Sequence, residues 1–230
     1  MSIAGVFGSA CYNSGMYTID ISRTLNPRLA VWPGDAPFAL QVVSDRRTGA
    51  AVNLTTLTLS AHTGTHIDAP HHIADNAQAV DALDLASYWG LAQVVTVAKP
   101  AGPLTPDDFA HVDLGRAPRL LVRSEASALD PAAFPSRYVY PSAALADALG
   151  ALGICLFGTD APSVDPVESE DLPGHQALLR NRIVILEGLD LSRAPDGLYE
   201  LVALPLKIAA GDGSPVRAAL RTLDPPLRNA

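Results

Sequence analysis

The sequence predicts a single compact domain of mixed α/β class, in which β-sheets are flanked by helices. Segments that alternate apolar and polar residues outnumber segments of helical periodicity, and the two kinds follow one another irregularly. Such an order does not fit the regular strand–helix alternation of a doubly wound sheet. The 19 prolines and 17 glycines divide the chain into short elements, and a hydrophobic content of 48% is sufficient for one core.

Strands are expected wherever apolar residues recur with period two or form a short apolar run between turn signals. They are predicted over residues 17–25, 38–45, 52–62, 91–98, 118–124, 154–160, 182–189 and 198–208. Residues 26–38 form a loop, because Pro33, Gly34 and Asp35 are strong turn residues.

Helices are predicted over residues 81–90, 105–114, 142–153 and 174–181. Thr105 with Pro106, and Ser142 after Pro141, are typical helix N-termini. Residues 1–16 are expected to be a poorly ordered leader, and residues 17–230 one domain without a linker or repeat.

Composition excludes several classes of function. The net charge is −8 and no run of Lys or Arg occurs, so nucleic acid is not an expected partner. No apolar run approaches the roughly 20 residues that span a bilayer. The first residues lack the basic segment of a signal peptide, so a cytoplasmic protein is expected. Two cysteines are too few for a disulfide framework.

Four of the six histidines lie in one segment, residues 60–72, which reads SAHTGTHIDAPHH. On a straight strand His62 and His66 would be about 13 Å apart, at ~3.3 Å per residue, which is too far for one metal ion. A helix would turn Asp68 away from them, and the Thr-Gly-Thr sequence is a poor helix former. A bend at Gly64 would gather His62, His66 and Asp68 around one point. The sequence therefore favours a bent segment that binds a metal.

Two imidazoles and one carboxylate form a ligand set that suits Zn²⁺, Mn²⁺ or Fe²⁺. Three protein ligands also leave positions for water or substrate, as in catalytic zinc sites. The alternative is a loop whose histidines bind no metal.

The same segment, HTGTHIDAPHH, resembles a motif of the metal-dependent cyclase family of hydrolases. The loop VWPGDAPF and the later blocks FGTDAPSVDP, RIVILEGLDL and YELVALPLKIAAGDGSPVRAAL extend the resemblance over residues 17–223. The resemblance implies a fold of the swivelling β/β/α type. It also implies a homodimeric enzyme with two Zn²⁺ ions per subunit and a small aromatic formamide, N-formylkynurenine, as substrate.

The resemblance also implies residue roles. One ion would be bound by His62, His66 and Asp68. The second would be bound by Asp68 and His175, with Glu187 contributing to the site. His72 would be the general acid/base and Trp32 would line the substrate pocket. His71 departs from the family pattern, so which of the two adjacent histidines faces the metals stays open.

The residues themselves allow other interpretations of these positions. His175, which opens a predicted helix, is equally well a surface residue. Glu187 ends an apolar strand, where a buried carboxylate requires either a metal or a salt bridge to an arginine such as Arg182 or Arg217. Trp32 could instead anchor its loop to the core. Asp160 and Asp165 follow a buried strand and are interpreted as turn-forming residues or as residues that orient the histidines.

Two further functions remain open at this point. Another hydrolase of the family could open a cyclic amide such as isatin. A protein of the same fold could also bind metal without catalysis.

Overall fold

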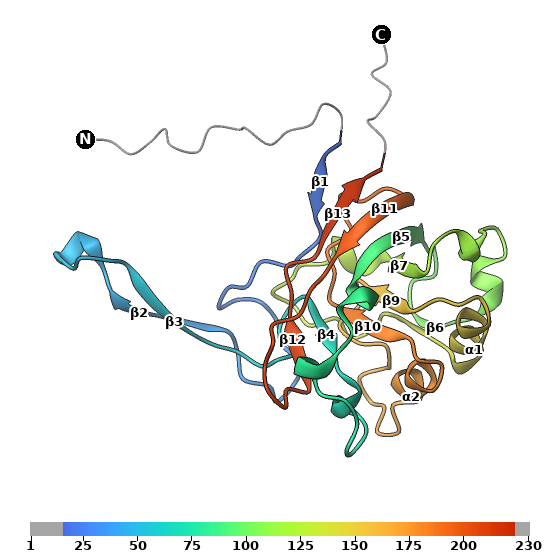
Figure 1. The fold of residues 1–230 in the computed structure, drawn as a ribbon, viewed down its shortest axis with the longest axis horizontal. Coiled ribbons are helices and arrows are strands. Elements are labelled where there is room, and N and C mark those ends of the chain that lie inside the picture. Colours follow the sequence, from blue (N-terminus) through green and yellow to red (C-terminus); the bar gives the residue numbers. More distant parts are fainter. Residues whose placement is uncertain (1–15, 224–230) are drawn as a thin grey trace, which may run out of the picture.

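The computed structural model describes residues 16–223, so the predicted leader lies outside the described residues except for Met16. A curled, mixed sheet of nine strands forms the centre of the molecule (Figure 1). Its strands, in spatial order, are β1 (Thr18–Asp20), β13 (Ala219–Thr222), β11 (Gly197–Val202), β5 (Trp89–Thr96), β7 (Arg119–Arg123), β9 (Leu156–Thr159), β10 (Val184–Glu187), β4 (His66–Asp68) and β12 (Gly213–Pro215).

The middle of the sheet is parallel and its two ends are antiparallel. Strands β5, β7, β9 and β10 run parallel, whereas β4 pairs antiparallel with both β10 and β12. The helices α1 (Ala143–Ala151) and α2 (Pro173–Arg180) contact each other beside the sheet. Within the described residues, neither is long and apolar enough to cross a membrane.

Alternation along the central strands produces a core on each face of the sheet. In β9, Phe157 belongs to the cluster that includes Leu145 of α1 and Leu178 of α2. Its neighbour Leu156 belongs to the second cluster, with Leu186 of β10. These strands are therefore buried on both faces, as expected for the parallel part of a sheet covered on both sides.

The structure confirms the helices predicted over residues 142–153 and 174–181. The helices predicted over residues 81–90 and 105–114 are wrong. Ser142 caps α1 by accepting a hydrogen bond from the backbone N–H of Leu145 at 3.1 Å. Residues 81–90 instead form two 3₁₀ turns followed by the start of β5, and residues 105–114 also form two such turns. Asp84 and Asp113 each cap a new turn and so interrupt a continuous helix. The 3₁₀ turns lie at Arg46–Thr48, Pro70–His72, Val80–Ala82, Leu85–Tyr88, Pro106–Phe109, Leu114–Arg116 and Glu125–Ala128.

Two smaller two-stranded sheets complete the fold. Strands β6 (Gly102–Leu104) and β8 (Val139–Pro141) pair in parallel. Strands β2 (Ala39–Ser44) and β3 (Leu54–Thr58) form a hairpin that projects away from the body (Figure 1). Its apolar side chains are exposed, and they are Leu40, Val42, Val43, Val52, Leu54 and Leu57.

Candidate metal centre and substrate pocket

The histidine segment bends at Gly64, which has a positive φ of 71°. Glycine adopts this backbone conformation without steric cost. The bend brings His62, which precedes it, close to the residues that follow it. Nδ1 of His62 lies 2.9 Å from Oδ1 of Asp68, and Nε2 of His66 lies 3.5 Å from the same oxygen. The structure thus brings the three residues around one point, in the geometry that their spacing favoured.

The register of the sheet adds Glu187 to this group. Strand β4 pairs with β10 so that His66 lies opposite Glu187. The Oε2 atom of Glu187 is 3.3 Å from Nε2 of His66, and its Oε1 accepts a hydrogen bond from the backbone N–H of Val164 at 2.8 Å. Both side chains are almost fully buried. Within the described residues Glu187 pairs with His66 and His175 and with neither Arg182 nor Arg217, so the salt-bridge interpretation does not hold.

His175 reaches the centre from the first turn of α2, where Asp165 fixes it. Oδ1 of Asp165 accepts from the backbone N–H of Gly174 at 2.7 Å, and Oδ2 accepts from Nδ1 of His175 at 2.8 Å. Because Nδ1 carries the donated proton, Nε2 is left to face Oδ2 of Asp68 at 3.3 Å. His175 is buried, so its interpretation as a surface residue is wrong. Asp165 orients a histidine, one of the two functions expected of it.

The donor atoms present fit a divalent metal ion. Nδ1 of His66 donates to the carbonyl oxygen of Gly64 at 3.0 Å, which leaves Nε2 as the ligand atom. Nε2 of His66 and Oδ2 of Asp68 are buried without a hydrogen-bond partner among the residues described. Unsatisfied buried polar atoms are costly unless an ion or water meets them. The ligand atoms of His66, Asp68 and Glu187 lie within 4.8 Å of one another.

Without a metal, the buried carboxylates hold protons on the histidines instead. Burial lowers the pKa of His66, but Asp68 and Glu187 outweigh this effect and raise it to about 10. Burial also lowers the pKa of His175, and Asp165 and Asp68 raise it to about 10. The site therefore attracts positive charge, which either protons or a metal ion supply.

Of the two adjacent histidines, the structure places His72 against the cluster. The His72 ring lies with its centroid 4.1 Å from that of His62, and it lines the pocket. His71 is exposed, and its backbone N–H donates to Gln78. Ligand atoms of His62, Asp68 and His72 also lie within 4.8 Å of one another, so His72 is placed both for proton transfer and for metal binding.

Asp212 is a residue of the site that sequence reasoning missed. Its Oδ2 lies 3.1 Å from Nε2 of His62 and 3.7 Å from Nδ1 of His72. The next residue, Gly213, pairs with Asp68, and a Cβ there would lie 2.8 Å from the ring of His62. An aspartate between two glycines just before a short strand was the only available signal.

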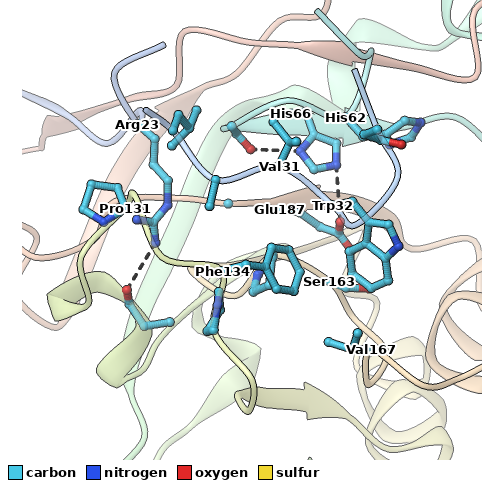
Figure 2. A pocket seen from close by; sticks show the side chains of 18 of the residues that line it. Arg23, Val31, Trp32, His62, His66, Pro131, Phe134, Ser163, Val167 and Glu187 are labelled. Carbon is cyan, nitrogen blue, oxygen red and sulfur yellow. Dashed lines mark hydrogen bonds and ion pairs between the residues drawn. The ribbon is translucent and has the colours of Figure 1, made fainter. Parts of the chain in front are cut away.

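A cavity of about 360 Å³ opens above the cluster (Figure 2). The histidines and Glu187 line one part of it, and Trp32 and Phe134 line another with rings in edge-to-face contact at a centroid distance of 5.4 Å. The structure places Trp32 at the pocket, as the resemblance implies. Flat aromatic walls of this kind suit an aromatic ligand.

Comparison with known proteins agrees with this fold. The chain belongs to the Cyclase family, whose family model matches residues 19–166. It is 45% identical over 212 residues to the kynurenine formamidase of Salinibacter ruber, covering 92% of this chain and 100% of that protein.

Solved structures give the same fold. A potential metal-dependent hydrolase with cyclase activity aligns with a TM-score of 0.78 at 26% identity, covering 91% of this chain and 100% of that one. Isatin hydrolase A from Labrenzia aggregata aligns with the same score and identity, covering 91% and 94% of the two chains.

Proposed function

We propose that this protein hydrolyses N-formyl-L-kynurenine to L-kynurenine and formate in tryptophan degradation, as a zinc-dependent arylformamidase. The main supporting observation is the position of the buried His–Asp–Glu cluster directly beneath a pocket with aromatic walls. Curated relatives at 39–45% identity are named kynurenine formamidase, and this chain covers 97–100% of the relatives at these identities. The catalytic domain would extend over residues 17–230, in the cytoplasm.

In this proposal, two Zn²⁺ ions occupy the cluster. His62, His66 and Asp68 would bind one ion, and His175 would bind the other together with Asp68, while Glu187 would contribute to the site. Divalent ions at this position would polarise the formyl group as Lewis acids. They would also ease the loss of a proton from the attacking water near neutral pH.

His72 is proposed as the group that transfers protons. The leaving group is an aniline nitrogen, which must gain a proton as the C–N bond breaks. The His72 ring lies at the pocket, beside His62, with its Nδ1 3.7 Å from Asp212. It can therefore receive a proton from the attacking water and return it to the nitrogen, while Asp212 orients the ring.

Trp32 and Phe134 would hold the substrate's aromatic ring. Their perpendicular contact provides an apolar wall that excludes water from one side of the pocket. Placement of the ring against this wall would direct the formyl group toward the histidines that line the same cavity.

One alternative activity has a specific observation in its favour. Isatin hydrolase A shares the fold at 26% identity, so cyclic-amide opening fits the same scaffold. The formamidase relatives are more similar, at up to 45% identity, and this difference favours the linear formamide. A metal-binding protein without catalysis is the third option.

A direct assay separates the three candidate functions. The purified, metal-loaded protein is incubated with N-formylkynurenine or isatin, and the product is followed by absorbance with and without a chelator. The proposal requires chelator-sensitive hydrolysis that is faster for N-formylkynurenine. Faster isatin opening would favour the alternative, and metal binding without turnover of either would favour the non-catalytic protein.

We also propose a homodimer in which the β2–β3 hairpin is the contact. Six apolar side chains are exposed on this projecting element. Exposed apolar surface of this kind marks association sites.

A further inference from the structure

We infer that Arg23 binds the α-carboxylate of an amino-acid substrate in the same pocket. This inference rests on the proposed function and adds a recognition site for the end of the substrate that does not react. Figure 2 shows Arg23 and Trp32 on different sides of the pocket. A ligand whose ring contacts Trp32 and whose formyl group meets the histidines would therefore have Arg23 within the same cavity.

Arg23 is held in place by hydrogen bonds to one side chain and two backbone carbonyl groups. Its own N–H donates to Oγ1 of Thr65 at 2.8 Å, next to the histidine segment. Its Nη2 donates to the carbonyl oxygens of Ala126 at 3.2 Å and Asp160 at 3.0 Å. These contacts fix the position of the guanidinium without neutralising its charge.

The positive charge of Arg23 has no carboxylate partner among residues 16–223. The nearby carboxylate of Asp160 is already occupied, because it accepts hydrogen bonds from the N–H and Oγ of both Ser124 and Ser127. Burial lowers the pKa of Arg23 more than Asp160 and Asp190 raise it. A largely buried cation of this kind is stabilised when an anion binds beside it.

Arg119 shows what a purely structural arginine looks like in this fold. It donates from Nε to Ser87, from Nη1 to Leu91 and from Nη2 to Ala86, in each case to a backbone carbonyl. Arg23 uses only Nη2 in this way, so Nε and Nη1 have no partner among the residues described. Those two nitrogens remain available to a ligand in the pocket.

The chemistry of the pocket fits a zwitterion. A guanidinium binds a carboxylate with two parallel hydrogen bonds, which gives both affinity and orientation. Asp35 and Asp130 line the same cavity and form no ion pair within the described residues, so they suit the α-ammonium group. The pocket therefore offers partners for both charges of an α-amino acid.

The experiment compares two formamides that differ only at the amino-acid end. N-formylkynurenine carries the carboxylate and ammonium groups, and 2′-formamidoacetophenone carries neither. Both release an ortho-aminophenyl ketone that absorbance detects. KM and kcat are measured for the wild-type protein, Arg23→Gln, Arg23→Lys and a control, Arg123→Gln. Arg123 is half-buried, donates to the carbonyl of Ala194 at 2.8 Å and does not line the pocket.

We expect Arg23→Gln to raise KM for N-formylkynurenine about 10- to 100-fold, as for a hydrogen bond to a charged group. Its KM for the acetophenone and its kcat for both substrates should stay within about twofold of wild type. Arg23→Lys should recover part of the loss, because it keeps the charge, and it also serves as the test if Arg23→Gln does not fold. The control should leave both KM values unchanged.

Two results would overturn parts of the account separately. If Arg23→Gln and Arg23→Lys change KM equally for both substrates, or for neither, Arg23 does not bind the carboxylate. The proposed formamidase activity would stand in that case. Failure of the metal-loaded wild-type protein to hydrolyse either formamide would refute the proposed function itself.

Discussion

Glu187 and His66 lie directly opposite each other on the antiparallel strands β10 and β4, with Oε2 of Glu187 3.3 Å from Nε2 of His66. This pairing joins the two halves of the candidate centre, which are far apart in the sequence. A shift of one residue in the register would turn one of the two side chains to the other face of the sheet. The sheet therefore determines the composition of the centre as much as the histidine segment does.

The two adjacent histidines should respond differently to substitution. His72→Ala should lower kcat by about 100- to 10,000-fold, as expected for loss of a general acid/base, while the metal content stays at the wild-type value. His71→Ala is the matched control, because His71 does not line the pocket, and its kcat should stay within about twofold of wild type. Metal analysis and steady-state kinetics measure both. Loss of one ion in His72→Ala would make His72 a ligand instead.

Asp165→Asn should weaken metal binding through His175. An amide has one accepting oxygen and one donating NH₂ group, so it cannot accept from both Gly174 and His175, and the imidazole loses its fixed tautomer. We expect about 10- to 100-fold weaker binding of one ion and a loss of ~1–2 kcal/mol in stability.

Competition with a chromophoric chelator and thermal unfolding measure these changes. Asp147→Asn is the control, since Asp147 makes an exposed ion pair with Arg180, and it should leave the stability close to that of the wild type. Wild-type affinity in Asp165→Asn would show that His175 needs no such support.

Metal binding should release protons. In the metal-free protein the carboxylates raise the pKa values of His66 and His175 to about 10, so both are protonated at pH 8. Ligating imidazoles must be neutral, so roughly two protons per subunit should leave, and metal affinity should increase with pH up to about 10. Calorimetric titration at pH 8 in buffers of different ionisation enthalpy measures the number released. A binding heat that does not depend on the buffer would contradict this.

The hairpin should control the oligomeric state. Leu40 and Leu57 face each other across β2 and β3, and both are about half-exposed. Changing both to Asn should raise the dimer dissociation constant at least about 100-fold, because four leucines would be lost per dimer. Leu152→Asn, an exposed leucine on the body, is the control. Sedimentation measurements over a range of concentrations give the dimer dissociation constant. A double variant that dimerises like the wild type would show that the hairpin is not the dimer contact.

Local sequence patterns predicted the parts of the fold that local physics determines. Ser142 after Pro141 marked the start of α1, and Gly64 marked the bend that gathers His62 and Asp68. The helices expected over 81–90 and 105–114 were wrong because capping aspartates divide each segment into separate 3₁₀ turns.

Residues that reach the site through tertiary contacts gave weaker signals. Asp212 and Arg23 are single charged residues whose spacing from other residues points to no ligand. The pairing of β12 with β4 brings Asp212 to His62, and hydrogen bonds to Thr65, Ala126 and Asp160 hold Arg23 at the pocket. His175 and Glu187 were assigned through resemblance, because the sequence alone left each with a structural alternative.

The most direct test of the central claim is a metal titration of the chelated protein with N-formylkynurenine as substrate. The account predicts no kynurenine formation without metal, and activity that rises with added Zn²⁺ to a plateau at two ions per subunit. His66→Ala, which lacks the histidine opposite Glu187, should not recover activity at that ratio. Full activity in the chelated protein, or none at full metal loading, would contradict the account.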